Sequence, residues 1–187
     1  MFKDIIKPTL VLIVISVVIS ALLAVTYNAT GVGELAASGL SAEELAEFQP
    51  QALPTASSLQ AVQTSLEAED ILGVYRDEGG SGAAFYVVTR GYDGEMKLLV
   101  GIDPSGAVAG VAAVDVSHET PGLGSRVGEK EFLDKFIGLS GSVTVDKTGD
   151  VDVDAIVNST VSSQAVGNGV NRALEAYESV KGELFGE

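Results

Sequence analysis

Hydrophobic residues are unevenly distributed along this chain, and the longest run of them is near the N-terminus. Residues 8–27 read PTLVLIVISVVISALLAVTY, and no charged residue occurs between Lys7 and Glu34. A helix of about 20 apolar residues rises roughly 30 Å, enough to cross the hydrocarbon core of a bilayer. Because lysines precede this run and acidic residues follow it, the pattern predicts a single-pass transmembrane helix with a cytoplasmic N-terminus, residues 1–7. The bulk of the chain then lies on the extracytoplasmic side of the cell (inner) membrane.

The same segment has some features of a cleaved signal peptide. A charged start precedes an apolar middle, and small residues follow near Ala24 and Ala29. We favour a retained anchor in contact with membrane lipid, because the run is longer than the apolar core of most signal peptides and no clean small-x-small cleavage site follows it. Residues 28–57 are predicted as a tether and a juxtamembrane helix.

That juxtamembrane helix is predicted from its boundaries. Ser41 and Glu44 have the spacing of a capping box, which opens a helix at about residues 41–49. Pro50 and Pro54 are expected to end it, because proline cannot continue the hydrogen-bonding pattern.

Further along the chain, the pattern changes to short apolar runs that are rich in valine. These runs span residues 83–89, 96–101 and 107–116, and turn signals separate them at residues 91–94 and 103–106. Connections this short favour antiparallel hairpins over parallel crossovers. The runs therefore predict a β-rich core.

The other segments are predicted mainly as helices. Residues 58–70 are expected to form a helical turn or two, and residues 129–138 and 162–184 have helical spacing of their apolar positions. Residues 142–145 are expected to add a strand. Residues 58–187 thus read as one α+β domain, with a curved, mainly antiparallel sheet and packed helices.

Composition limits the chemistry. The chain of 187 residues has no Cys and one His, which excludes disulfides, iron–sulfur ligation and a Cys nucleophile. Any redox chemistry therefore needs an organic cofactor. Net charge is −15, and residues 1–30 carry +1, so the rest of the chain carries −16. Such an acidic surface repels nucleic acid, and we reject a nucleic-acid role.

A cluster of hydroxyl residues precedes the last predicted helix. Residues 154–166 read DAIVNSTVSSQAV, with Thr160 among three serines. Hydroxyl side chains are favoured as helix N-caps. The free N–H groups at the start of a helix also stabilise an anion such as phosphate. Both interpretations can hold for different hydroxyls: Ser162 would cap the helix while Thr160 carries a phosphate.

Residues 118–124 read HETPGLG and are predicted to form a sharp loop, because Pro121 fixes one backbone angle and Gly122 and Gly124 permit unusual ones. This loop and the hydroxyl cluster, in this order behind one apolar helix, resemble the FMN-binding G subunit of the Rnf-type ion-translocating electron transport complex. The related C subunit of the sodium-pumping NADH:quinone reductase shares the same domain.

The resemblance implies a covalently attached cofactor. In that family FMN is joined through its phosphate to a threonine hydroxyl, and the matching residue is Thr160. A separate flavin transferase uses FAD and a divalent metal; the threonine oxygen attacks the phosphorus of the FMN half, and AMP leaves. The base that assists the hydroxyl is either Asp154 or a group of the transferase.

The resemblance also implies further cofactor contacts, with no catalytic residue and no metal ligand in this chain. In the loop, glycine lets the backbone approach the flavin ring and Leu123 presses on it; Tyr92 could border the ring. The chain departs from the family pattern at Val157, Asn158 and Ser159, where the family has Ser/Thr, Gly and Ala. Asn can adopt the left-handed conformation that Gly favours. The implied contacts are Glu119, Thr120, Leu123, Gly124, Asp154, Ser159, Val161, Ser162 and Ser163.

Taken together, these features imply a redox subunit without independent catalytic activity. It would relay electrons through FMN within a ferredoxin:NAD oxidoreductase that is coupled to Na⁺ or H⁺ translocation. Its partners would be the other membrane, iron–sulfur and flavin subunits of that complex. Two alternatives stay open: a structural subunit that carries no flavin, and a stand-alone extracytoplasmic flavoprotein.

Overall fold

The structure, a computed structural model, describes residues 15–16, 19–20 and 39–186. The chain divides after Ser38 into two units. The predicted anchor, residues 8–27, lies largely outside the described residues, and its four described residues are helical. Among the residues that the structure describes, no helix is long and apolar enough to span a membrane.

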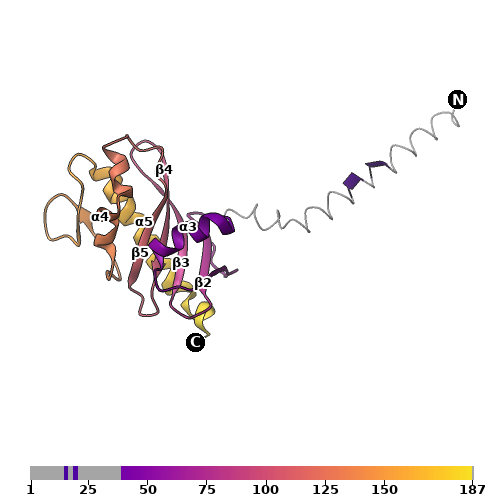
Figure 1. Cartoon of the computed structure of the whole chain (residues 1–187). Helices are drawn as coiled ribbons and strands as arrows, with labels where there is room; N and C mark the ends of the chain where they lie inside the picture. Colours follow the sequence, from indigo (N-terminus) through magenta and orange to yellow (C-terminus); the bar gives the residue numbers. More distant parts are fainter. Residues whose placement is uncertain (1–14, 17–18, 21–38, 187) are drawn as a thin grey trace, which may run out of the picture. The chain divides into compact units, whose positions relative to one another are not determined.

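A five-stranded sheet forms the centre of the second unit (Figure 1). Its strands are arranged in chain order and every neighbouring pair is antiparallel, which confirms the hairpins predicted from the short connections. The strands are β1 (Leu59–Ala61), β2 (Ile71–Asp77), β3 (Ala83–Arg90), β4 (Glu95–Ile102) and β5 (Val108–Asp115).

Helices cover both faces of this sheet. On β3, Phe85 and Val87 pack in the larger core with helix α5 (Thr160–Phe185), whereas Ala84 and Tyr86 pack with helix α3 (Ala42–Ala52). Antiparallel sheets more often expose one face, and their strands then alternate apolar and polar residues. Burial on both faces explains why these strands read as nearly continuous apolar runs.

Helix α3 begins as predicted. The Ser41 hydroxyl accepts a hydrogen bond from the Glu44 N–H (3.3 Å), and the Glu44 carboxylate accepts one from the Ser41 N–H (2.9 Å). The predicted end at Pro50 was wrong, because the helix continues to Ala52. A proline in the last turn removes one backbone hydrogen bond, and the complete burial of Ala52 in the core beneath the helix offsets that loss.

The end of α3 lies directly on the backbone of the sheet. Gly101 of β4 and Gly110 of β5 are register partners, so they form a strip without side chains. A Cβ at Gly101 would overlap the carbonyl oxygen of Ala52, and one at Gly110 would overlap that of Gln51. Residues from Gly39 onward therefore belong to the same unit as the sheet.

The segment before β3 differs from its prediction. The helical turns expected at residues 58–70 were wrong, since β1 pairs there with β2, a strand that the pattern did not indicate. Both strands carry weak local signals: β1 is only three residues long, and Gly73 and Arg76 interrupt the apolar pattern of β2. Pairing of β2 with β3, and of β1 with β2, supplies the stability that the local sequence lacks.

The C-terminal half was predicted in outline. The helical region at residues 129–138 is broken into short turns, although its stripe of Phe132, Leu133 and Phe136 is buried as expected. The strand expected at residues 142–145 is reduced to the short strand β6, which pairs in parallel with β7. These elements are η1 (Gly124–Gly128), α4 (Lys130–Leu133), η2 (Asp134–Phe136), β6 (Val145–Asp146) and β7 (Val153–Asp154).

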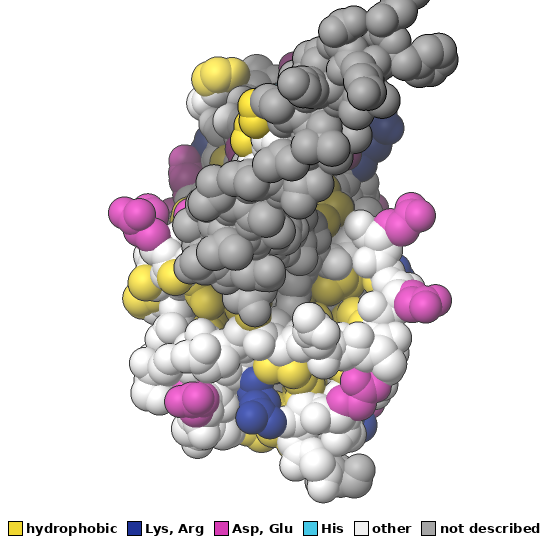
Figure 2. All heavy atoms as spheres, turned by 90° about the vertical axis from the view of Figure 1, so that its right-hand side faces the viewer, with side chains coloured by type: hydrophobic (Ala, Val, Ile, Leu, Met, Phe, Trp, Pro, Cys, Tyr) yellow, Lys and Arg dark blue, Asp and Glu magenta, His cyan; other side chains and the backbone are white. Residues whose placement is uncertain are grey.

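Acidic side chains are spread around the face shown in Figure 2, with hydrophobic side chains between them.

Asp77, at the end of β2, is an acidic residue that is buried, with 1% of its surface exposed. Its carboxylate accepts hydrogen bonds from the N–H groups of Ser57 (3.1 Å), Ser58 (3.2 Å) and Ser81 (3.0 Å). Burial raises the pKa of Asp77, but these hydrogen bonds outweigh burial and hold the pKa well below its usual range.

Candidate functional site

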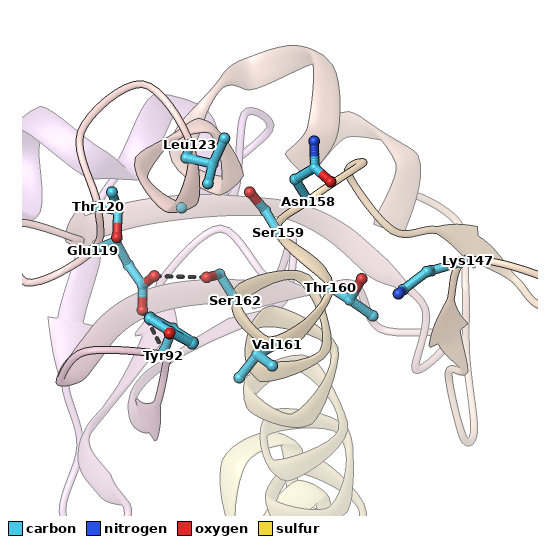
Figure 3. A pocket seen from close by; sticks show the side chains of 11 residues that line it. Tyr92, Glu119, Thr120, Leu123, Lys147, Asn158, Ser159, Thr160, Val161 and Ser162 are labelled. Carbon is cyan, nitrogen blue, oxygen red and sulfur yellow. Dashed lines mark hydrogen bonds between the residues drawn. The ribbon is translucent and has the colours of Figure 1, made fainter.

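A cavity of about 440 Å³ lies at the N-terminal end of α5 (Figure 3). This volume is within the range of small-molecule binding sites. Its lining comes from four parts of the chain: the β3–β4 turn, the loop after β5, the β6–β7 loop and the start of α5. The lining residues are Tyr92, Glu119, Thr120, Leu123, Gly124, Lys147, Asn158, Ser159, Thr160, Val161 and Ser162.

Glu119 fixes the inner wall of the cavity. Its side chain is 2% exposed, and its two carboxylate oxygens accept hydrogen bonds from the Tyr92 N–H (2.7 Å) and the Ser162 hydroxyl (2.6 Å). A Cβ at Gly91 or Gly124 would overlap this carboxylate. The buried carboxylate therefore joins the β3–β4 turn to α5, and the two glycines make room for it.

The loop after β5 is folded tightly, as its composition predicts. Gly122 has a positive φ of 74°, which favours glycine. Its N–H donates to the Ser125 hydroxyl (2.9 Å), and the Thr120 carbonyl accepts from the N–H groups of Leu123 and Ser125 (both 3.1 Å). The Leu123 side chain is held at the cavity, where it stays partly exposed.

The start of α5 differs from the prediction in register. The helix begins at Thr160, not at residue 162, and Ser159 takes the N-cap position. Asn158 has φ 66°, the left-handed conformation expected of a residue that replaces Gly. The Ser163 hydroxyl then donates to the Ser159 carbonyl (2.8 Å) and accepts from the Ile156 N–H (3.0 Å). This local closure starts the helix two residues early.

The register decides which hydroxyl groups are free. Ser162 and Ser163 are engaged within the protein, so Ser162 is not the cap that the sequence predicts. Ser159 Oγ is buried and has no hydrogen-bond partner in the described part of the chain. Thr160, half-buried at the cavity, makes no side-chain hydrogen bond to any described residue. Buried polar atoms without partners are uncommon, so the Ser159 hydroxyl leaves a hydrogen-bonding capacity unmet at the helix N-terminus, where anions are stabilised.

The cavity has both apolar and charged walls. The apolar part consists of three exposed hydrophobic side chains, Tyr92, Leu123 and Val161. Figure 3 shows them on the β3–β4 turn, the loop after β5 and the first turn of α5. Lys147 is the one cation among the lining residues, and its ammonium group points toward Thr160 (Figure 3). Planar aromatic ligands with a charged group match such a combination of surfaces.

The structure brings together eight of the ten residues implied at the sequence level, all except Asp154 and Ser163. Asp154 lies on β7, exposed and opposite Asp146, and Ser163 is fully buried behind the first turn of α5. Lys147 was missed, because it lies in an acidic stretch and reaches the cavity only through the pairing of β6 with β7. No local signal in the sequence distinguishes it from a solvated lysine.

Comparison with known proteins agrees with this geometry. Residues 91–175, which include every lining residue, match the family model described as the FMN-binding domain. The crystal structure of the C subunit of Na⁺-translocating NADH-quinone reductase from Parabacteroides distasonis superimposes with a TM-score of 0.55 at 18% identity, covering 75% of this chain and 96% of that chain. The fold is thus that of the FMN-binding domain class.

Two relatives are similar over nearly their whole length. The G subunit of the Na⁺-translocating ferredoxin:NAD⁺ oxidoreductase complex of Acetobacterium woodii is 30% identical, with 96% of this chain and 94% of the relative covered. The G subunit of the ion-translocating oxidoreductase complex of Methanosarcina acetivorans is 33% identical, with 96% and 98% covered. The chain belongs to the G-subunit family of Rnf-type ion-translocating oxidoreductase complexes, which confirms the resemblance noted from the sequence.

Proposed function

We propose that this protein is an electron-transfer subunit of an Rnf-type complex and carries FMN in the cavity at the start of α5. Membership of the G-subunit family and the match to the FMN-binding domain support this function. Its partners are the other subunits of a ferredoxin:NAD oxidoreductase that translocates Na⁺ or H⁺. FMN, when bound, supplies the capacity to take up and release one or two electrons.

The cavity fits the phosphate end of FMN at the helix terminus. The first N–H groups of α5 have no partner within the helix, and Ser159 Oγ is buried without one among the described residues. These groups and the ammonium of Lys147 can donate to phosphate oxygens. Thr160, which heads the helix with its hydroxyl free, is the attachment point that we propose for a phosphoester. This free hydroxyl beside an unpartnered buried one is the observation that carries the proposal.

The apolar walls fit the ring system. Tyr92, Leu123 and Val161 offer exposed hydrophobic surface at the cavity, and a flavin ring that covers them removes that surface from water. Glu119 supports cofactor binding without touching the ring. Its two carboxylate oxygens accept hydrogen bonds from two walls of the cavity and hold these walls in place. The chain therefore binds and orients the cofactor, while Glu119 keeps the cavity in shape.

The departures from the family pattern do not close the site. Asn158 adopts the left-handed conformation that Gly would supply, and Val157 is 76% exposed outside the cavity lining. A missing hydroxyl at residue 157 therefore removes no group from the cavity wall. These observations favour the flavin-carrying subunit over a structural subunit that lacks flavin.

We further propose that residues 8–27 anchor the protein in the membrane, that residues 28–38 form a tether, and that the unit from Gly39 onward is an extracytoplasmic FMN-binding domain, in which the expected juxtamembrane helix α3 packs on the sheet. The apolar run and the lysines before it support this arrangement. Membership of a complex that translocates ions requires a place at the membrane. A stand-alone flavoprotein would purify without multispanning subunits, which distinguishes it from the complex.

The test is covalent flavin attachment. The protein is expressed with its flavin transferase, denatured, separated by gel electrophoresis and viewed under ultraviolet light, alongside Thr160→Ala and the control Thr148→Ala. Thr148 is exposed on the β6–β7 loop and does not line the cavity. We expect flavin fluorescence from the wild type and the control and none from Thr160→Ala. A dark wild-type band, with a related family member fluorescent in the same host, would reject covalent attachment and favour a subunit without flavin.

A further inference from the structure

Strand pairing places Lys147 at the cavity, although this residue lies outside the hydroxyl cluster that contains Thr160. It follows Asp146, whose register partner on β7 is Asp154. The Asp146 carbonyl accepts from the Ala155 N–H (2.8 Å), so the residue before Lys147 is tied to the segment that leads into Thr160. The lysine and the threonine thus approach the cavity from two segments that hydrogen bonds hold together.

The charge of Lys147 is not used elsewhere in the described part of the chain. Its loop contains Asp146, Asp150 and Asp152, yet the lysine forms no ion pair with any described residue. Asp152 instead accepts from the N–H and hydroxyl of Thr144 (both 2.8 Å), and Asp146 accepts from the Lys147 backbone N–H (2.7 Å). Figure 3 shows the ammonium group directed at Thr160.

Three kinds of donor for an anion therefore meet at Thr160: the N-terminus of α5, the unpartnered Ser159 hydroxyl, which is 5% exposed, and the Lys147 ammonium group. We propose that Lys147 is the positioning residue for the phosphate of the flavin nucleotide, and that it holds this phosphate beside Thr160 during attachment and afterwards. This inference rests on the proposed function. In a protein whose charge is −15, a local cation also reduces repulsion of the incoming anion.

In the attachment step, Thr160 Oγ1 forms a bond to the phosphorus of the FMN half of FAD, and the phosphorus–oxygen bond to AMP breaks. AMP leaves with the electron pair of that bond, and the hydroxyl proton passes to a base, either Asp154 or a group of the transferase. Lys147 neutralises charge on the phosphate oxygens and keeps the phosphorus within reach of Thr160. The lysine ammonium is a point charge on a flexible side chain. An arginine at this position keeps the positive charge, whereas a glutamine removes it.

The experiment measures the rate of flavin attachment to purified apoprotein with transferase, FAD and Mg²⁺, for Lys147→Gln and Lys147→Arg. The control is Lys130→Gln, which removes the same charge from an exposed pair with Asp134. We expect attachment to Lys147→Gln to be about tenfold slower, Lys147→Arg to be within about threefold of wild type, and the control to be unchanged. High salt should narrow the difference in rate between the wild type and Lys147→Gln, because it screens the attraction of Lys147 and also the repulsion from the acidic surface.

A second readout does not depend on rate. In the loaded proteins, the ³¹P resonance of the phosphodiester should shift in Lys147→Gln and stay in place in Lys130→Gln. Equal rates and equal resonances for Lys147→Gln and wild type would overturn the inference, and so would an Arg variant as slow as the Gln variant. Neither result would affect the proposed function, which fails only if the wild type acquires no flavin at Thr160.

Discussion

A single buried carboxylate, Glu119, holds two walls of the cavity together. Its oxygens accept from the Tyr92 N–H and from the Ser162 hydroxyl, and the side chain is almost fully shielded from water. Hydrogen bonds to a charged group are stronger than neutral ones, and a buried donor left without a partner is costly. The residue therefore contributes to stability as well as to the shape of the site.

Glu119→Gln tests this role. The amide has the same shape but one acceptor oxygen, so one of the two donors would face an NH₂ group. We expect the free energy of unfolding, measured by urea denaturation in detergent solution, to fall by about 2 kcal/mol. The control, Glu129→Gln, breaks an exposed pair with Arg126 and should change it by less than about 0.5 kcal/mol. Equal losses in the two variants would contradict a special role for Glu119.

At this scale the sequence predicts some residues well and misses others for a physical reason. Leu123, Gly124 and Thr160 belong to local segments whose turn and hydroxyl chemistry can be read without the fold. The place of Lys147 depends on the pairing of β6 with β7, and the use of Ser162 depends on Glu119, which is distant in the chain. Such contacts leave no trace in local composition, so the polar partners of a site are harder to predict than its loops.

Among the elements, helix α3 depends on bare backbone beneath it. The carbonyl groups of Gln51 and Ala52 occupy the positions where side chains on Gly110 and Gly101 would lie. Neither the helix nor the strands could approach so closely with larger residues, because close-packed interiors do not absorb an extra methyl group without displacement.

We expect Gly101→Ala and Gly110→Ala each to lower the free energy of unfolding by about 2 kcal/mol, because a methyl group would force α3 away from the sheet. Limited proteolysis should also cleave α3 sooner in both variants. Gly128→Ala is the control, since its methyl group would meet no backbone atom: it would lie at contact distance from Ala113 Cβ (3.4 Å) and near a Val116 methyl group (3.2 Å), which can move by rotation of that side chain. Variants as stable as the wild type would show that α3 does not need the glycine strip.

The connection between β1, β2 and β3 depends on Asp77 and therefore on pH. Hydrogen bonds hold the folded-state pKa of Asp77 below its usual range, although burial opposes them. A depressed pKa stabilises the folded state above the unfolded pKa of about 3.9, and this stabilisation is lost as the pH falls toward the folded value.

Asp77→Asn should thus unfold more easily than the wild type at pH 7, by about 2 kcal/mol, and the difference should narrow as the pH falls below about 4. Urea denaturation at a series of pH values measures both quantities. Asp150→Asn, in an exposed loop, serves as the control. A difference that stays constant with pH would show that the carboxylate charge is not what holds the connection.

The elements also show where sequence patterns lose force. Strands β3, β4 and β5 follow from their apolar runs, and α5 follows from the helical spacing of its apolar positions. Strand β2 forms because β3 offers an edge to pair with, and β1 then pairs with β2, so short or interrupted segments become strands without any strong local preference. The end of α3 is likewise set by its contact with Gly101 and Gly110, which overrides the signal from Pro50.

The whole molecule combines an acidic domain with an apolar N-terminal run, and we propose a different function for each part. The cavity gathers its lining at the end of the sheet where the connections of several strands meet the start of α5. All of the described lining residues lie between Tyr92 and Ser162. For the N-terminal run we propose a place at the membrane. Substitutions that stop this run from entering the membrane should therefore change where the protein is located without changing its flavin binding.

Ile15→Lys with Ile19→Lys tests the proposed anchor in the full chain. Both residues are helical and lie one turn apart, so the variant places two charges on one side of the predicted span. A lysine near the centre of a membrane helix costs about 3 kcal/mol, and two should prevent stable insertion. We expect the wild type and the control, Ile15→Leu with Ile19→Leu, to stay with membranes after alkaline carbonate extraction, whereas the lysine variant is released. Protease added outside the cytoplasmic membrane should digest the wild-type domain. A wild-type protein that is soluble and begins beyond residue 27 would instead identify the run as a cleaved signal peptide.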